Sequence, residues 1–198
     1  MITPQYTDEE KNALRGYQMD PYLLNSKLRD DTATISDCFK MQIQRLDSAL
    51  KKSKQDEPVT LYRATFLKDI EKRITGNGND RYLEYPAYMS TAIMKYRIVG
   101  IEIQSLLKKH FNSIFGYQGE NTPVLLTIHC PTDFELVPIY KILDSSEYEV
   151  LIGRNREFKI VEEKRDISYS LQLLFDNFVP KECKQLFHYE LVAINKGN

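Results

Sequence analysis

Cysteine and histidine are scarce in this chain of 198 residues. The three cysteines lie far apart and form no CxxC pair: Cys38, Cys130 and Cys183. Such spacing predicts reduced thiols and a protein that works in a cytosol. The three histidines are equally scattered: His110, His129 and His188. Because no metal-ligand spacing is present, we expect no metal.

The chain also lacks an excess of either charge sign. It has 27 Lys and Arg residues against 28 Asp and Glu, a formal net charge of -1. This balance argues against nucleic acid or an anionic lipid surface as a partner. No apolar run approaches the ~20 residues of a membrane span, and residues 1–6 lack the basic and apolar regions of a signal peptide. We therefore expect no membrane partner, and any export would use another route.

Apolar residues, at 42% of the chain, are plentiful enough for a core, and the length suits a single domain over 1–198. Thr7 and Glu10 form a capping-box pattern, which predicts a helix through about Arg15. A second helix is predicted at 21–28. A third is predicted at 35–50, where apolar residues recur at steps of three and four. Strands are predicted at 59–64, 85–92, 123–130, 134–138, 148–152, 157–162 and 188–194, with a short helix at 66–74, a turn at 76–80 and an ambiguous segment at 98–111. Helices in 1–57 followed by strands in 58–198 predict an α+β fold.

Two carboxylates stand one residue apart where one apolar strand begins, in the run Glu147-Tyr148-Glu149-Val150-Leu151-Ile152. In an extended strand Glu147 and Glu149 would point the same way, with Cα atoms roughly 6.5 to 7 Å apart. Like charges at that range resist joint ionisation, which raises the pKa of one carboxylate unless cations or hydrogen bonds compensate. The alternative is an ordinary Glu-x-Glu pair on a solvent-exposed face.

Two earlier strands carry further polar groups. Arg63 lies near the end of the run 59–64, where it is either an edge residue or an anion ligand. Ser90 and Thr91 close the run 85–92, where hydroxyls ordinarily form turns. Strand with Arg, strand with Ser-Thr and strand with Glu-x-Glu follow one another in that order along the chain.

This order resembles the arginine-serine-glutamate class of mono-ADP-ribosyltransferases, which includes bacterial toxins and effectors. The aromatic-Arg motif is matched by Leu61-Tyr62-Arg63. The Ser-Thr-Ser motif is matched by Ser90-Thr91-Ala92, which departs at its third residue. The third motif is matched by the Glu147 to Ile152 run and by Phe158-Lys159-Ile160. An upstream helical element of the toxin members is matched by Tyr17, Tyr22, Leu23, Leu24, Asn25, Leu28 and Arg29.

The resemblance implies a split, roughly perpendicular β-sandwich with NAD, as co-substrate, in the cleft between the sheets. Glu149 is then the carboxylate that stabilises the oxocarbenium-like centre formed when nicotinamide leaves. Arg63 clamps the pyrophosphate, because its planar fork suits bidentate phosphate binding, and Arg29 and Asn25 assist it. Ser90 hydrogen-bonds Glu149 and holds its rotamer.

Two further contacts to the dinucleotide follow from the same resemblance. Thr91 supports either its strand or the nicotinamide amide. Phe115 stacks on nicotinamide, unless it is a core side chain tucked under a loop.

For Glu147 the resemblance implies an arginine acceptor, and some members with this signature modify threonine or other residues. A guanidinium holds its proton at neutral pH, so its activation needs a nearby carboxylate. The loop 140–146 resembles the family's substrate loop, and Tyr148 contacts the target protein or is an edge-strand aromatic. We expect a bacterial effector or toxin, secreted by a specialised system, that modifies a host or competitor protein in the target-cell cytosol. Two alternatives remain: an NAD glycohydrolase, and an inactive transferase fold that binds proteins.

Overall fold

The computed structural model describes residues 4–30, 32–93, 122–144, 148–165 and 187–195. Three helices come first: α1 (Asp8–Met19), α2 (Pro21–Arg29) and α3 (Asp37–Lys52). Thr7 accepts from the Glu10 backbone N–H at 3.2 Å, and the Glu10 carboxylate accepts from the Thr7 N–H at 2.8 Å. This reciprocal pair is the predicted capping box, and it satisfies two N–H groups that the first helical turn leaves free. The first helix continues four residues beyond the predicted end.

The strands form one nine-stranded sheet in the order β2-β3-β8-β9-β5-β1-β4-β7-β6. All neighbours pair antiparallel except β5 and β9, which are parallel. The bounds are β1 (Val59–Phe66), β2 (Ile74–Asn77), β3 (Asp80–Tyr85), β4 (Met89–Ile93), β5 (Pro123–Cys130), β6 (Leu136–Pro138), β7 (Glu149–Ile152), β8 (Arg156–Arg165) and β9 (Phe187–Ala193).

Several local predictions differ from the structure. The segment predicted as a short helix contains α4 (Leu67–Ile70), a 3-10 turn η1 (Glu71–Arg73) and the start of β2. The predicted turn at 76–80 is the tip of a β2–β3 hairpin, whose strands were not predicted because β2 is mostly exposed and has no apolar alternation. The predicted strand 85–92 is interrupted at Pro86, and β4 begins at Met89. The segment 98–111 lies outside the described residues.

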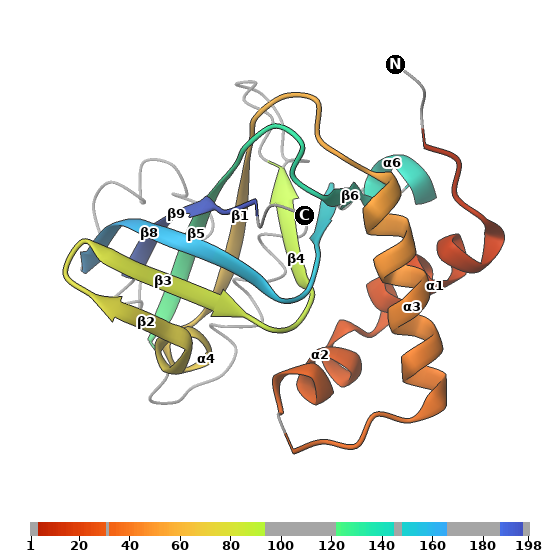
Figure 1. Ribbon diagram of the computed structural model, residues 1–198, viewed down its shortest axis with the longest axis horizontal. Coiled ribbons are helices and arrows are strands. Elements are labelled where there is room, and N and C mark those ends of the chain that lie inside the picture. Colours follow the sequence, from red (N-terminus) through yellow and green to blue (C-terminus); the bar gives the residue numbers. More distant parts are fainter. Residues whose placement is uncertain (1–3, 31, 94–121, 145–147, 166–186, 196–198) are drawn as a thin grey trace, which may run out of the picture.

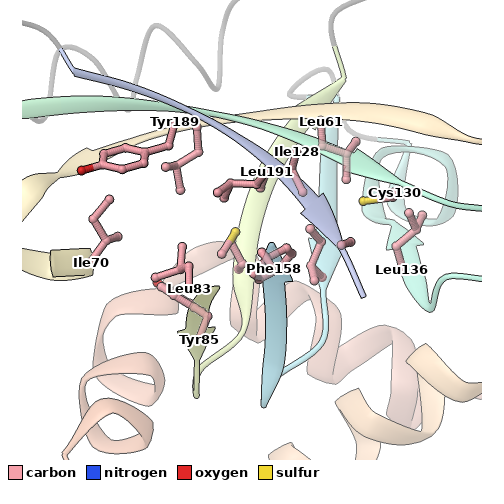
Figure 2. Packing of buried hydrophobic residues seen from close by; sticks show 14 of the residues in the cluster. Leu61, Ile70, Leu83, Tyr85, Ile128, Cys130, Leu136, Phe158, Tyr189 and Leu191 are labelled. Carbon is pink, nitrogen blue, oxygen red and sulfur yellow. The ribbon is translucent and has the colours of Figure 1, made fainter. Parts of the chain in front are cut away.

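Two apolar cores hold the molecule together. One fills the inside of the curled sheet, where the strands of its two halves cross steeply and side chains such as Leu61, Leu83 and Phe158 face one another (Figure 2). The other lies between the three helices and the β4–β7–β6 end of the sheet, and includes Leu14, Leu46 and Leu151. Helices α1–α3 and the short α6 (Ile139–Leu143) accordingly gather at one side of the sheet (Figure 1). The fold is α+β, with N-terminal helices followed by strands, as the sequence predicts. The two crossing layers expected from the resemblance are the two halves of one curled sheet.

Among the described residues, no helix combines the length and apolar character that a membrane crossing requires.

Candidate active site

Glu149 is the first residue of β7, and only 2% of its surface is exposed. The strand does not extend back through Tyr148, whose φ is 50°, a left-handed conformation. The predicted start of this strand at Tyr148 is therefore wrong by one residue, because a left-handed residue does not continue an extended strand. The Tyr148 ring instead packs on Tyr140 of α6, with ring centroids 5.4 Å apart. Glu147 lies outside the described residues.

Ser90 lies inside β4, beside β7 in the sheet, and is 5% exposed. Its Oγ donates a hydrogen bond to Glu149 Oε1 at 2.6 Å, which is the contact that the sequence predicts. Thr91, on the next position, donates from Oγ1 to the Val150 carbonyl at 2.7 Å and is fully buried. Thr91 thus ties β4 to β7, while Ser90 orients the carboxyl group of Glu149.

Arg63 approaches the same point from β1, the strand on the other side of β4. Its Nη1 donates to the Ser90 carbonyl at 2.6 Å. Its Nε is buried and has no hydrogen-bond partner among the described residues. A buried donor left without a partner costs free energy, and this is a position where a ligand oxygen would recover it.

The helical element contributes Asn25 and Arg29 from α2. Asn25 is 5% exposed; its Oδ1 accepts from the Tyr88 N–H at 3.1 Å and its Nδ2 donates to the Tyr17 hydroxyl at 2.9 Å. Burial raises the pKa of Tyr17 well above its ordinary value, so this hydroxyl stays neutral. Asn25 thereby fastens α2 to the segment that leads into β4. Arg29 donates from Nε to the Asn25 carbonyl at 3.1 Å.

These residues border a cleft of about 960 Å³ between the helices and the sheet. Its lining includes Asn25, Arg29, Arg63 and Ser90, and Glu149 is joined to it through Ser90. One wall of this cleft was not predicted from the sequence; α4 and η1 provide it with Lys68, Lys72 and Arg73. The four-residue spacing of Lys68 and Lys72 was visible in the sequence, but such spacing is ordinary on solvated surfaces.

The structure does not describe all the residues of two predicted features, the nicotinamide-stacking aromatic and the substrate loop. Phe115 lies outside the described residues, as does the end of the loop 140–146. Its start forms α6, after which Asp144 adopts a left-handed φ of 52°. Within the described ranges, no group of three or more His, Cys, Asp or Glu residues is placed to hold a metal ion.

The arrangement of Arg63, Ser90 and Glu149 on three neighbouring strands invites comparison with known proteins. A family model described as "ADP-ribosyltransferase exoenzyme" matches residues 2–181. The chain belongs to this family. It is an NAD-dependent mono-ADP-ribosyltransferase, and its class is the bacterial toxin type that the sequence motifs resemble. No curated protein sequence matches the transferase.

Solved structures share its fold. The ADP-ribosyltransferase toxin Plx2a from Paenibacillus larvae is 18% identical, with a TM-score of 0.64 over 96% of the transferase and 88% of the toxin. C3stau2 from S. aureus, solved with NAD, is 17% identical, with a TM-score of 0.64 over 98% and 90% of the two chains. The transferase Vis from Vibrio splendidus, solved with agmatine, is 19% identical, with a TM-score of 0.62 over 96% and 76%.

Proposed function

We propose that the transferase moves ADP-ribose from NAD to an arginine side chain of a target protein and releases nicotinamide. The observation that carries this proposal is the 2.6 Å hydrogen bond from Ser90 to Glu149, two buried residues. Arg63, on the neighbouring strand β1, donates a hydrogen bond to the carbonyl of the same Ser90. A carboxylate held in one orientation beside a cationic cleft suits a reaction that generates positive charge on a phosphorylated sugar.

In this reaction the bond between C1′ of the nicotinamide ribose and the ring nitrogen breaks, and its electron pair leaves on nicotinamide. Glu149 stabilises the oxocarbenium-like ribose electrostatically, as a carboxylate does in glycoside hydrolysis. Ser90 holds the Glu149 rotamer, and Thr91 supports this arrangement through the β4–β7 pairing. The carboxylate therefore needs no reorganisation when charge develops.

The residues present fit the pyrophosphate of NAD. The buried Nε of Arg63 lacks a partner among the described residues, and a phosphate oxygen would supply one. Arg29 adds a second guanidinium to the cleft, and Asn25 holds α2 in place against Tyr88. Phe115 is the proposed stacking partner of nicotinamide. C3stau2, which has the same fold, was solved with NAD.

For the acceptor, we assign Glu147 the task of orienting the guanidinium and taking the proton that it loses when its nitrogen bonds to C1′. Agmatine, the compound bound to Vis, also carries a guanidinium group, which supports an arginine acceptor over threonine. Tyr148 and the loop 140–146 would contact the target. The left-handed Tyr148 sets the direction in which the chain enters β7.

We infer further that the transferase is a secreted effector or toxin whose target is a host or competitor protein in the target-cell cytosol. Residues 1–198 act as one domain, with the helical segment 1–57 closing one side of the cleft and the β-rich segment 58–198 carrying the reactive groups. No described feature favours a dedicated glycohydrolase or an inactive binding fold over a transferase, and the intact Arg63, Ser90 and Glu149 favour catalysis.

The test uses purified protein, biotinylated NAD and a eukaryotic cell lysate, followed by streptavidin capture and mass spectrometry of the modified sites. We expect arginine-linked label with the wild type, and turnover lower by about two to three orders of magnitude for Glu149→Gln. Glu147→Gln should lose protein labelling but keep nicotinamide release. Glu84→Gln, an exposed carboxylate on β3, is the matched control and should label normally.

Three outcomes would contradict elements of the proposal. Nicotinamide release without any labelled protein, unchanged by Glu147→Gln, would indicate a glycohydrolase. Normal turnover of Glu149→Gln would move the catalytic carboxylate elsewhere. Label on threonine would reassign the acceptor.

A further inference from the structure

Arg73 joins the two walls of the cleft. It belongs to η1, and its Nη2 donates a 2.9 Å hydrogen bond to the backbone carbonyl of Arg29, the last residue of α2. The two residues are 44 positions apart in the sequence, both are half-buried, and both line the cleft. The bond therefore connects the β1–α4–η1 side of the cleft to its helical side.

This bond satisfies the C-terminal end of α2. The last four carbonyls of an α-helix have no partner within the helix, and together they carry a partial negative charge. A guanidinium at this end supplies a donor and a compensating positive charge. Two carboxylates lie near Arg73 in sequence, Asp69 and Glu71, but among the described residues neither forms an ion pair with it. The Arg73 side chain is therefore directed to α2 and not to its acidic neighbours.

The position of α2 depends on a small number of contacts. The helix has nine residues, of which only Leu24 and Asn25 are buried. Asn25 accepts from the Tyr88 N–H, which fixes the middle of the helix to the segment before β4. Leu24 and the half-buried Leu28 pack against the apolar cores, but apolar burial is non-directional. The bond from Arg73 is a second directional contact, four residues or about 6 Å further along the helix.

The end of α2 also sets the place of a guanidinium that the proposed function uses. Arg29 Nε donates to the Asn25 carbonyl at 3.1 Å, one turn back, so the Arg29 side chain lies along its own helix and moves with it. Arg63, by contrast, is held on β1 by its bond to the Ser90 carbonyl. The separation of the two guanidinium groups therefore depends on how the end of α2 is attached to the β1–α4–η1 side, and Arg73 makes that attachment.

We propose, resting on the proposed function, that Arg73 is a positioning residue for NAD: it holds the end of α2 so that Arg29 and Arg63 reach the same pyrophosphate. Two guanidinium groups bind one diphosphate well only when their separation matches it, because bidentate contacts to phosphate oxygens tolerate little displacement. Arg73 therefore acts on the binding of NAD, through Arg29. Glu149 is oriented separately, by Ser90 across β4 and β7, so the chemical step does not depend on Arg73.

The experiment replaces Arg73 by Met, which keeps an apolar stem and removes the guanidinium. Steady-state release of nicotinamide should show a KM for NAD raised about tenfold and a kcat within about threefold of the wild type. Arg73→Lys keeps the charge and a donor, and should bring KM back to within about threefold of the wild type. The matched control is Arg81→Met, a half-buried Arg outside the cleft lining that pairs with Glu163 at 2.6 Å. It should lower the melting temperature and leave KM unchanged.

A direct contact between Arg73 and NAD would also raise KM, and a double-mutant cycle with Arg29 separates the two roles. Isothermal titration with ADP-ribose, which carries the pyrophosphate and is not turned over, gives dissociation constants for the wild type, Arg73→Met, Arg29→Met and the double variant. Arg29→Met keeps the backbone carbonyl to which Arg73 donates. If Arg73 acts through the Arg29 side chain, Arg73→Met should weaken binding about tenfold in the wild type and by less than about twofold in Arg29→Met.

The outcomes separate the two proposals. If the wild type neither binds ADP-ribose nor releases nicotinamide, the proposed function itself fails. If the wild type is active and Arg73→Met has its normal KM, the positioning inference is overturned while the function stands. Equal losses of ADP-ribose affinity in both backgrounds would mean that Arg73 contacts the dinucleotide itself, and a fall in kcat at unchanged KM would place its effect on the chemical step; each of these also overturns the inference. Melting temperatures establish that each variant is folded, and Arg73→Gln takes the place of Arg73→Met in the cycle should the latter not fold.

Discussion

At the scale of single residues, Ser90 makes two hydrogen bonds, one through its backbone and one through its side chain, to two different residues. Its carbonyl accepts from Arg63 and its hydroxyl donates to Glu149. This is possible because β4 lies between β1 and β7 in the sheet. One residue therefore sets the positions of both the cation that is proposed to bind phosphate and the carboxylate that is proposed to stabilise the ribose.

Ser90→Ala should lower kcat and leave the KM for NAD within about threefold, because a hydrogen bond to a charged group contributes about 1.5–3 kcal/mol and this one acts on the carboxylate alone. The expected loss in kcat is about 10- to 100-fold. Steady-state release of nicotinamide measures both constants.

The matched control is Ser36→Ala, which removes the N-cap of α3 far along the chain from the site. It should reduce stability by about 1 kcal/mol and leave kcat unchanged. An unaltered kcat in Ser90→Ala would show that Glu149 holds its orientation without the hydroxyl.

At the scale of elements, the β2–β3 hairpin depends on two glycines with positive φ that differ in their surroundings. A Cβ on Gly76 would lie 1.9 Å from the Asp80 carbonyl oxygen, whereas one on Gly78 would meet nothing within 4 Å. Their φ angles are 80° and 60°. A side chain added at either position would therefore strain the backbone, but only one added at Gly76 would also clash with a neighbouring atom.

Gly78→Ala should cost about 1 kcal/mol from left-handed strain, while Gly76→Ala should cost at least about 2 kcal/mol because backbone must move as well. Urea denaturation of both variants gives the free energies of unfolding. Faster amide hydrogen exchange confined to 74–85 would locate the damage in the hairpin. Equal losses in the two variants would mean that the hairpin tip relaxes freely.

Helix α1 is held to α3 through the buried side chain of Glu10, which accepts from Ser48 at 2.7 Å and Lys52 at 2.8 Å. Burial acts to raise the pKa of Glu10, but the hydrogen bonds from Lys52, Ser48 and the Thr7 backbone outweigh it and lower the pKa below its ordinary value. Since the folded pKa is the lower one, Glu10 stabilises the fold above the ordinary range near 4.3–4.5, and that contribution disappears as pH falls through the folded value.

The difference in unfolding free energy between wild type and Glu10→Gln should therefore be largest near pH 7 and shrink steadily toward about pH 3. Denaturant unfolding at a series of pH values measures it. Glu57→Gln makes the same change at an exposed carboxylate after α3 and serves as the control. A difference that grows on acidification would mean that burial dominates the titration of Glu10.

At the scale of the whole molecule, the cleft exists only because the helices pack against one end of the sheet (Figure 1). Asn25 and Tyr17 from the helices bond to Tyr88, just before β4, and Asp47 of α3 accepts from the Tyr88 hydroxyl at 2.6 Å. Arg154, between β7 and β8, pairs with the same Asp47 at 2.8 Å. The helical and β-rich segments are thus joined by buried and half-buried polar contacts beside the site.

A ligand that bridges these segments should stabilise all of them together. NAD at 100 times its dissociation constant should stabilise the wild type by about 2.7 kcal/mol. In Arg63→Lys most of that gain should vanish at the same NAD concentration, because Lys lacks the planar fork and the donor at Nε. Thermal unfolding with and without NAD measures the effect. Arg45→Lys, exposed on α3, should respond like the wild type, and an unchanged NAD response in Arg63→Lys would exclude Arg63 as the clamp.

Local signals in the sequence predicted the helices and the long strands well. Residues close together in the sequence specify the capping box, the amphipathic helix α3 and the apolar strand β5. The hairpin strand β2 was not predicted because most of its residues are exposed and show no apolar alternation. It forms through pairing with β3 and not through burial. Tyr148 was missed for a related reason: a left-handed tyrosine is sterically unusual, and its neighbours must impose it.

The sequence by itself determined which residue types serve the chemistry proposed for the site, because Arg63, Ser90 and Glu149 follow one another in a recognisable order along the chain. Only the tertiary structure decided how they meet, since nothing local makes β1, β4 and β7 neighbours in the sheet. It also brought the α4–η1 cations to the cleft, where their charges, unremarkable along the chain, become concentrated. Local preferences act between adjacent residues, whereas a binding site is made by segments that folding brings together over long sequence separations.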